Sequence, residues 1–169
     1  MFEWLAEYQF DTRLLPHVTA LLFAYVLALP IAWDRERNER SAGLRTFPLV
    51  AIAACGFIQA AETVTRENAE ATARIVEGLI NGVGFIGGGA ILVGKASIRG
   101  TATAASLWAT GAIGAAVGLG AYETAIILSI VTFATLRFMT SFKSEANEDT
   151  DRRKGGPSDR ANAKCSPHQ

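Results

Sequence analysis

The 169-residue chain has few of the residues from which metal centres and disulfide scaffolds are built, with two cysteines and two histidines. Cys55 lies in an apolar stretch and Cys165 in a polar one, so no structural disulfide is predicted. His17 and His168 are far apart in the sequence, and no Cys/His cluster has the spacing of a zinc site. The sequence therefore predicts neither a zinc centre nor a disulfide-stabilised domain.

Catalytic motifs are also missing from the chain. The glycine cluster at 82–89 is not followed by the Gly-Lys-Ser/Thr of a P-loop. Gly82, Gly84 and Gly87 have the spacing of a dinucleotide-binding fingerprint, but they lie in an apolar run with no strand before them, so we assign the match to chance. No Ser/His/Asp or HExxH arrangement occurs, and the formal net charge is zero. We therefore expect no enzymatic activity, no catalytic residue, no cofactor and no nucleic-acid partner.

Long apolar runs dominate what the chain does contain. Hydrophobic residues make up 50% of the sequence, and they gather in blocks close to the roughly 20 residues that a helix needs to cross a bilayer. The first block follows an acidic leader and ends in a charged run, unlike a signal peptide, so we expect a retained helix. The predicted spans are residues 14–33, 47–61, 78–94, 102–120 and 124–139. The fold class is thus predicted to be an all-α membrane protein with about five transmembrane helices.

The polar segments complete the predicted organisation. Residues 1–13 are predicted to form a short external N-terminus, and residues 14–140 the transmembrane domain. The stretch 62–77 contains no glycine or proline and predicts a short surface helix, whereas 95–101 predicts a turn. From residue 141 the chain is polar and cannot bury a core, so 141–169 are predicted to be a disordered cytoplasmic tail.

Basic residues are distributed unevenly over the predicted loops. With five spans, the first loop, the third loop, the end of the last span and the tail share one side, and that side holds 13 of the 16 Lys and Arg. Because cytoplasmic loops are enriched in Lys and Arg, we predict that the N-terminus lies outside and the C-terminus lies inside.

Glycine is concentrated in the third and fourth predicted spans. In lipid, glycine lets neighbouring helices approach closely, although in a soluble helix each one costs about 1 kcal/mol. The predicted helix-packing residues are Gly78, Gly82, Gly84, Gly87, Gly88, Gly89, Gly111, Gly114 and Gly118. The sequence therefore predicts a bundle packed through small residues.

A charged loop follows the first predicted span. It is either a solvated loop that sets the topology or a carboxylate–guanidinium network that closes the cytoplasmic end of the bundle. The members of that network are Asp34, Arg35, Glu36, Arg40, Arg45 and Thr46. Asp34 and Glu36 are also candidate ligands for a hard cation such as magnesium, which prefers oxygen donors.

Two further groups of polar residues lie in the predicted spans. Glu77 and Asn81 are four residues apart and share a helix face with Arg74 nearby, which predicts either the lining of a polar cavity or interhelical hydrogen bonds. The second group consists of Thr103, Ser106 and Thr110. These hydroxyls are predicted to bond across helices or back to their own carbonyls, so helix packing is favoured over ligand binding.

Three sequence motifs follow one another in a specific order. The first combines Asp34-Arg35-Glu36 with Ala42-Gly43-Leu44-Arg45-Thr46. The second combines Arg74-Ile75 with Gly82-Val83-Gly84-Phe85-Ile86-Gly87-Gly88-Gly89. The third combines Arg99-Gly100 with Thr103-Ala104-Ala105-Ser106-Leu107-Trp108 and Thr110-Gly111-Ala112-Ile113-Gly114. Together they resemble the MgtC/SapB family of bacterial inner-membrane proteins over roughly residues 15–138, with departures at Asp34, Phe47 and Ala102.

The resemblance implies a role in magnesium homeostasis, in membrane-potential control, or in survival under low magnesium or acid stress. Longer family members carry a soluble cytoplasmic C-terminal domain, so this chain resembles a form with the membrane domain alone. The resemblance also implies membrane partners, because some members are described as magnesium-transport accessory proteins and one as restraining the proton-translocating ATP synthase.

Three hypotheses for the function remain open. The leading one is a non-enzymatic accessory protein in the lipid bilayer that acts through another inner-membrane protein, such as ATP synthase or a magnesium transporter. The second is a small homo-oligomeric channel or transporter for Mg²⁺ or H⁺, with Glu77, Asn81 and the Asp34/Glu36 pair along its path. The third is a structural scaffold. Few polar residues are predicted near the midplane, which favours the accessory hypothesis.

Overall fold

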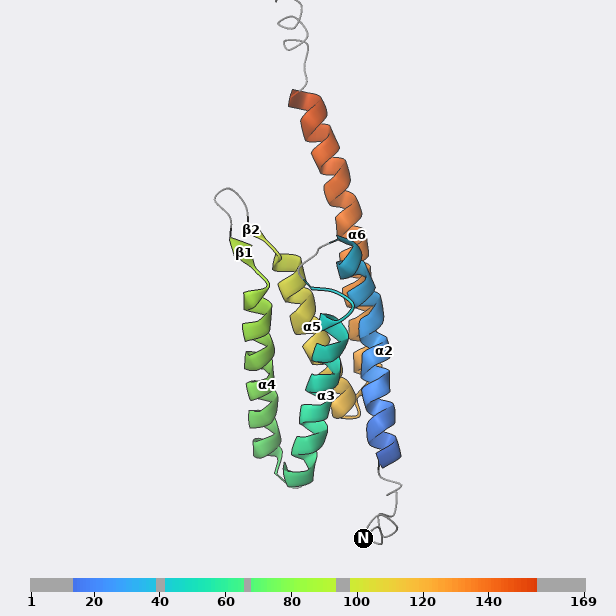
Figure 1. The fold of residues 1–169 in the computed structure, drawn as a ribbon, viewed down its shortest axis with the longest axis vertical. Helices are drawn as coiled ribbons and strands as arrows, with labels where there is room; N and C mark the ends of the chain where they lie inside the picture. Colours follow the sequence, from blue (N-terminus) through green and yellow to red (C-terminus); the bar gives the residue numbers. More distant parts are fainter. Residues whose placement is uncertain (1–13, 39–41, 66–67, 94–97, 155–169) are drawn as a thin grey trace, which may run out of the picture. The chain divides into compact units, whose positions relative to one another are not determined.

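The computed structural model describes residues 14–38, 42–65, 68–93 and 98–154, which form five helices and two short strands (Figure 1). The helices are α2 (Leu14–Asn38), α3 (Thr46–Thr65), α4 (Ala69–Gly89), α5 (Thr101–Gly118) and α6 (Tyr122–Lys154). The strands are β1 (Leu92–Val93) and β2 (Ile98–Arg99). The chain divides into two units, Met1–Ala134 and Thr135–Gln169, and α6 belongs to both. The all-helical class predicted from the sequence is confirmed.

α2 differs from the other described helices in combining length with an apolar composition. It is the one helix in this part of the chain that is long and apolar enough to cross a membrane by length and composition. A shorter apolar helical segment, Thr46–Glu62, lies in α3.

Small residues fill the centre of the first unit. α3 contacts α2, α4 and α5, and α5 also contacts α2 and α4, so α3 and α5 form the middle of the packing. On α2, Ala20, Ala24 and Ala28 are buried at intervals of four residues and therefore share one helix face. Where α3 meets α5, a Cβ added to Gly114 would collide with the carbonyl oxygen of Ala51. The two backbones approach this closely because no side chain separates them.

The polar stretch 62–77 differs from the single surface helix predicted for it. α3 continues to Thr65 and α4 begins at Ala69. Asn68 caps the new helix from an extended backbone conformation, and its side-chain oxygen accepts a hydrogen bond from the Ala71 N–H at 3.1 Å. Asparagine is favoured at this position because its side chain satisfies one of the unpaired N–H groups of the first turn.

A β-hairpin replaces the end of the predicted third span. α4 ends at Gly89, not at residue 94, and β1 pairs antiparallel with β2, with Leu92 opposite Arg99. Three consecutive glycines at 87–89 weaken the helix there. Gly100 follows the hairpin with a φ of 87°, and a Cβ at this position would also collide with the carbonyl oxygen of Ala90. Glycine therefore permits the sharp turn that leads into α5.

The last helix is longer than predicted. The final span was expected to end at residue 139 and disorder to begin at 141, but α6 continues to Lys154. Residues 141–154 contain no glycine or proline, and both residue types appear directly afterwards at 155–157. The polar segment keeps adequate helix propensity until that point. The remainder of the predicted tail, 155–169, lies outside the described residues, as does the predicted external segment 1–13.

Candidate functional site

The last turn of α2 carries a buried ion pair. Asp34 and Arg35 are 4% and 3% exposed. The Nη2 and Nε atoms of Arg35 donate to Oδ2 of Asp34 at 2.6 and 3.2 Å, and Nδ2 of Asn38 donates to Oδ1 at 3.1 Å. Buried charges are tolerated when they are paired and hydrogen-bonded. These two residues therefore form a packed end to the helix, in contrast to a solvated loop.

Glu36 connects α2 to the chain that precedes α3. Its Oε2 accepts a hydrogen bond from the Leu44 N–H at 3.0 Å. A Cβ on Gly43 would collide with the same carboxylate, so the Ala-Gly-Leu sequence lets the loop approach it. The predicted network is thus divided into a buried Asp34–Arg35 pair and a separate bond from Glu36 to the backbone. Arg40 lies outside the described residues.

The candidate metal ligands Asp34 and Glu36 have most of their oxygens engaged. Both oxygens of Asp34 accept hydrogen bonds, and so does Oε2 of Glu36. The part of the chain that the structure describes holds no group of three or more His, Cys, Asp or Glu side chains that could hold a metal ion. A hard cation takes six or more oxygen ligands, so these two carboxylates offer it few donors as they lie.

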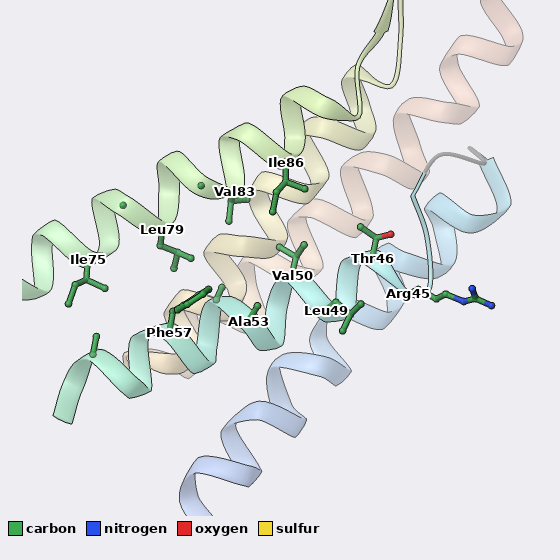
Figure 2. Close-up of a pocket in the computed structure, with 14 residues that line it drawn as sticks. Arg45, Thr46, Leu49, Val50, Ala53, Phe57, Ile75, Leu79, Val83 and Ile86 are labelled. Atoms are coloured by element: carbon green, nitrogen blue, oxygen red, sulfur yellow. The ribbon is translucent and has the colours of Figure 1, made fainter. Parts of the chain in front are cut away.

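A groove of about 840 Å³ lies between α3 and α4 (Figure 2). Its walls are apolar or glycine, and they include Leu49, Ala53 and Phe57 from α3 and Leu79, Gly82 and Ile86 from α4. Its polar lining residues are Arg45 and Thr46, which are adjacent at the start of α3. The α3–α4 groove is therefore apolar along its length and carries a cation at one end. The groove was not predicted from the sequence, although small residues in two successive apolar segments were a visible signal.

A smaller and more polar cavity of about 410 Å³ lies where α2 begins and α3 ends. His17, Gln59, Glu62 and Tyr122 are among its lining residues. The Nε2 of Gln59 lies 3.4 Å from the carbonyl oxygen of His17, which joins α3 to α2 at this end. The two cavities share Ala61 and Ile75 as lining residues and differ in polarity.

The predicted polar face of α4 is exposed. Glu77 and Asn81 both lie on the outside of the first unit, and neither lines the α3–α4 groove. Arg74 pairs with Glu70 through Nη2 and Oε1 at 2.8 Å, and the two side chains are 76% and 77% exposed. Such exposed pairs contribute little to stability. The structure therefore places these residues on one helix without enclosing them.

Two buried hydroxyls of α5 bond within their own helix. Thr103, Ser106 and Thr110 are all buried. Ser106 Oγ and Thr110 Oγ1 each donate to a carbonyl oxygen one turn earlier at 2.8 Å, which is the second of the two alternatives predicted for these hydroxyls. A hydroxyl that does cross between helices is that of Ser129 on α6, which donates to the carbonyl oxygen of Leu27 on α2 at 2.7 Å. Ser129 was not predicted from the sequence, because one serine in an apolar span carries no periodic signal.

The nine predicted packing glycines fall into two groups. The first group has neighbours close to where a Cβ would lie, and it consists of Gly87, Gly111, Gly114 and Gly118. The second group has no atom within 4 Å of an added Cβ, and it consists of Gly78, Gly82, Gly84, Gly88 and Gly89. Packing within the chain therefore accounts for the first group. For the second group a packing role stays a prediction, because it would require a further helix to pack against these glycines.

Comparison with known proteins connects this fold to one family. The MgtC family profile matches residues 21–145. Protein MgtC of Salmonella typhimurium is 36% identical over 116 residues, which cover 69% of this chain and 49% of that protein. Protein SrpB of Synechococcus elongatus is 37% identical over 135 residues, covering 73% of this chain and 72% of that protein. Protein MgtC of Brucella abortus is 33% identical over 121 residues, covering 71% and 50%.

No solved structure matches the chain. The chain spans about half the length of the MgtC relatives that it matches. The profile match extends from α2 into α6 and includes the buried ion pair, the α3–α4 groove and the hairpin. The chain belongs to the MgtC family.

Proposed function

We propose that this chain is a multi-pass protein of the bacterial inner membrane, with its small-residue bundle in the bilayer. Large apolar side chains on four helices support this location, because soluble proteins rarely expose extended apolar surface. They include Leu15 and Leu22 on α2, Phe57 on α3, Phe85 on α4, and Ile127 and Ile130 on α6. The charged residues Asp34 and Arg35 lie at the end of α2, as expected near a membrane boundary.

Within the membrane, the proposed function is that of an accessory protein that modulates ion homeostasis through a membrane partner. The observation that carries this proposal is the contact between α3 and α5. A Cβ on Gly114 would collide with Ala51, and a Cβ on Gly118 would lie 2.7 Å from Cβ of Ile58. The middle of the bundle is therefore filled by backbone and small side chains, which favours a protein that acts by contact over a single-chain pore. Magnesium or proton balance is the homeostasis that the family resemblance suggests.

The second candidate is a homo-oligomeric transporter for Mg²⁺ or H⁺. The exposed positions of Glu77 and Asn81, four residues apart on α4, support it. Polar side chains that face lipid are costly, so an interface between copies would give them partners and a path. The polar cavity near His17 and Glu62 would then lie toward the outer mouth of that path.

Cation flux into liposomes separates the two candidates. The full chain is reconstituted with magnesium- and proton-sensitive dyes inside the vesicles, as wild type, Glu77→Gln and Asn81→Leu. Ile80→Leu is the matched control, because Ile80 is exposed on the same helix and carries no polar group. The accessory proposal expects no flux above that of empty liposomes from any of the four proteins.

The flux measured in liposomes is compared with the growth of cells at low magnesium. An accessory protein supports growth and changes the membrane potential in cells while it gives no flux in liposomes, and ATP synthase is the first partner to test by crosslinking. Flux that Glu77→Gln and Asn81→Leu abolish and Ile80→Leu keeps would overturn the accessory proposal and assign a transporter. If the protein gives neither flux nor a growth effect, the structural scaffold becomes the preferred function.

A further inference from the structure

The α3–α4 groove combines an apolar trough with a cationic end. Leu49 and Phe57, which line it, are 60% and 64% exposed, so the trough opens to the outside of the first unit. Figure 2 shows Leu79, Val83 and Ile86 of α4 pointing toward α3. Arg45 and Thr46 lie at the end where α3 begins, and the Arg45 side chain extends outward beyond that end. A ligand that fits both parts needs an apolar body and an anionic head.

The dimensions of the groove suit an acyl chain. Its volume of about 840 Å³ lies within the roughly 300–1,000 Å³ that small-molecule pockets occupy. Its α3 wall runs from Arg45 to Ala61, which is about 24 Å at 1.5 Å per residue. One leaflet of the hydrocarbon core is about 15 Å thick, half of the bilayer core. A lipid chain that starts at the Arg45 end therefore stays inside the groove through its whole leaflet.

The cationic end is able to hold a phosphate. Arg45 is exposed, and no ion pair joins it to another of the described residues. The carboxylate of Glu36, close in the sequence, is bonded to the Leu44 N–H. Guanidinium is suited to phosphate because it presents several donors in one plane.

The backbone at the start of α3 contributes little to anion binding. The N–H groups of Thr46 and Phe47 donate to the carbonyl oxygen of Gly43 at 3.0 and 3.2 Å. The next residue, Pro48, has no N–H. The donors left for an anion are the Arg45 guanidinium and the Thr46 hydroxyl, so removal of the Arg45 side chain should remove most of the preference for a charged head.

We propose that the α3–α4 groove binds one anionic phospholipid, whose phosphate lies at Arg45 and Thr46 and one of whose two acyl chains lies between α3 and α4. This rests on the proposed membrane location. The lipid source is the surrounding cytoplasmic leaflet. The alternative occupant, a helix from a second copy or another membrane protein, would fill the apolar trough but would leave the cationic end unused.

A glycine on the α4 wall allows the groove to be filled by a single substitution. A Cβ on Gly82 would meet no atom within 4 Å, and Gly82 lines the groove, so we expect the side chain of Gly82→Leu to occupy the groove. Gly84 has the same free space but does not line the groove, so Gly84→Leu is its matched control. Arg37 is exposed at the end of α2 and does not line the groove either, so Arg37→Ala is the matched control for Arg45→Ala.

Lipid binding is measured by native mass spectrometry on the full chain in detergent, titrated with dioleoyl-phosphatidylglycerol or dioleoyl-phosphatidylcholine. These lipids share their acyl chains and their phosphate, and they differ in net charge because the choline cation of phosphatidylcholine neutralises the phosphate. We expect the wild type to prefer the anionic lipid about tenfold, the order of one charge-assisted hydrogen bond. Arg45→Ala loses this preference and Arg37→Ala keeps it. Gly82→Leu weakens the binding of both lipids about tenfold, whereas Gly84→Leu changes it less than twofold.

Several results would overturn the lipid site. One is that the wild type and Arg45→Ala each bind the two lipids equally well. This result would indicate annular lipid only. Another is an equal effect of Gly82→Leu and Gly84→Leu. If Gly82→Leu leaves lipid adducts unchanged but abolishes crosslinking between copies, the groove binds a helix and the lipid proposal is wrong.

Folding and membrane location are checked separately from lipid binding. Circular dichroism compares the helix content of the variants, and if Gly82→Leu does not fold, Ala53→Leu fills the groove from the facing wall of α3. Carbonate extraction of native membranes tests the location. A chain released by carbonate overturns the proposed membrane function, whereas a chain that stays in the membrane without a preference for phosphatidylglycerol overturns only the lipid site.

Discussion

Two ion pairs of the first unit show how burial changes the role of a charged residue. Asp34–Arg35 and Glu70–Arg74 have the same chemistry and similar separations of 2.6 and 2.8 Å. The first pair has side chains that are 4% exposed, and the second has side chains more than 70% exposed. Water screens the exposed pair and lets both partners separate at little cost, whereas the buried charges depend on each other.

Asp34→Ala is therefore expected to destabilise the protein far more than Glu70→Ala. Loss of the Asp34 carboxylate removes the acceptor of the Arg35 and Asn38 hydrogen bonds, and breaking a buried pair costs about 3–5 kcal/mol. Glu70→Ala should change the free energy of unfolding by about 1 kcal/mol or less. Denaturant unfolding in detergent, followed by circular dichroism, measures both. Equal losses would mean that Asp34 is solvated in the folded protein.

The contact between Asn38 and Asp34 was not predicted, although the sequence contains a signal for it. The i, i+4 spacing of Asp34 and Asn38 predicts contact once the segment is helical. The bond between the adjacent residues Asp34 and Arg35 was not predictable in this way, because neighbours at i, i+1 on a helix do not face each other. Their burial depends on packing between segments, which no local pattern encodes.

At the scale of elements, glycine has two distinct uses in the chain. Gly114 lies at the contact between α3 and α5, where a Cβ would collide with the Ala51 carbonyl oxygen. Gly84 is also in a helix, yet a Cβ on it would meet nothing within 4 Å. Composition and spacing do not separate the two cases. The difference is set by the neighbouring helix.

The same substitution at these two positions should have opposite effects. Gly114→Ala forces α3 and α5 apart and is expected to cost about 1–3 kcal/mol, the range for overpacked cores. Gly84→Ala gains helix propensity and is expected to be neutral or stabilising by up to about 1 kcal/mol. The midpoint of thermal unfolding in detergent gives the comparison. A Gly114→Ala protein as stable as Gly84→Ala would show that the α3–α5 contact is looser than the structure has it.

The sequence predicted the existence of the helices better than their ends. Apolar blocks indicate the part of a helix that favours lipid, and each of the five blocks overlaps one of the described helices. The helices continue past those blocks because polar residues such as Asp34–Asn38 and 141–154 keep helix propensity. The hairpin at 92–99 was missed because two residues are too few for an alternating pattern.

For the whole molecule, the family was readable from three ordered motifs, whereas the α3–α4 groove was not. The groove arises because α3 and α4 run in opposite directions side by side, with small residues such as Ala53 and Gly82 on their facing sides. Its cationic end comes from Arg45, which the sequence analysis had assigned to a charge network. Motifs identify relatives, but a cavity between two helices follows from how far apart they pack.

The alternating direction of the helices also predicts a topology that can be measured. Figure 1 shows that α2 ends, α3 begins and the hairpin lies toward one end of the first unit, and the turn between α5 and α6 lies toward the other. The first end holds Arg35, Arg37, Arg45 and Arg99 together with Asp34 and Glu36, whereas the second holds Arg74 together with Glu62, Glu70 and Glu123. By the preference of Lys and Arg for the cytoplasm, the first end is predicted to lie inside.

Cysteine labelling in cells tests this orientation. In a Cys165→Ser background, with Cys55 buried in the core, a membrane-impermeant maleimide should label Glu123→Cys in spheroplasts. It should label Leu44→Cys only after the membrane is permeabilised, because Leu44 lies beside Arg45 at the inner end. The reverse pattern, or equal labelling of both positions, would contradict the prediction. A reversed chain would also place Arg45 in the outer leaflet, so the anionic lipid of the α3–α4 groove would then have to come from that leaflet.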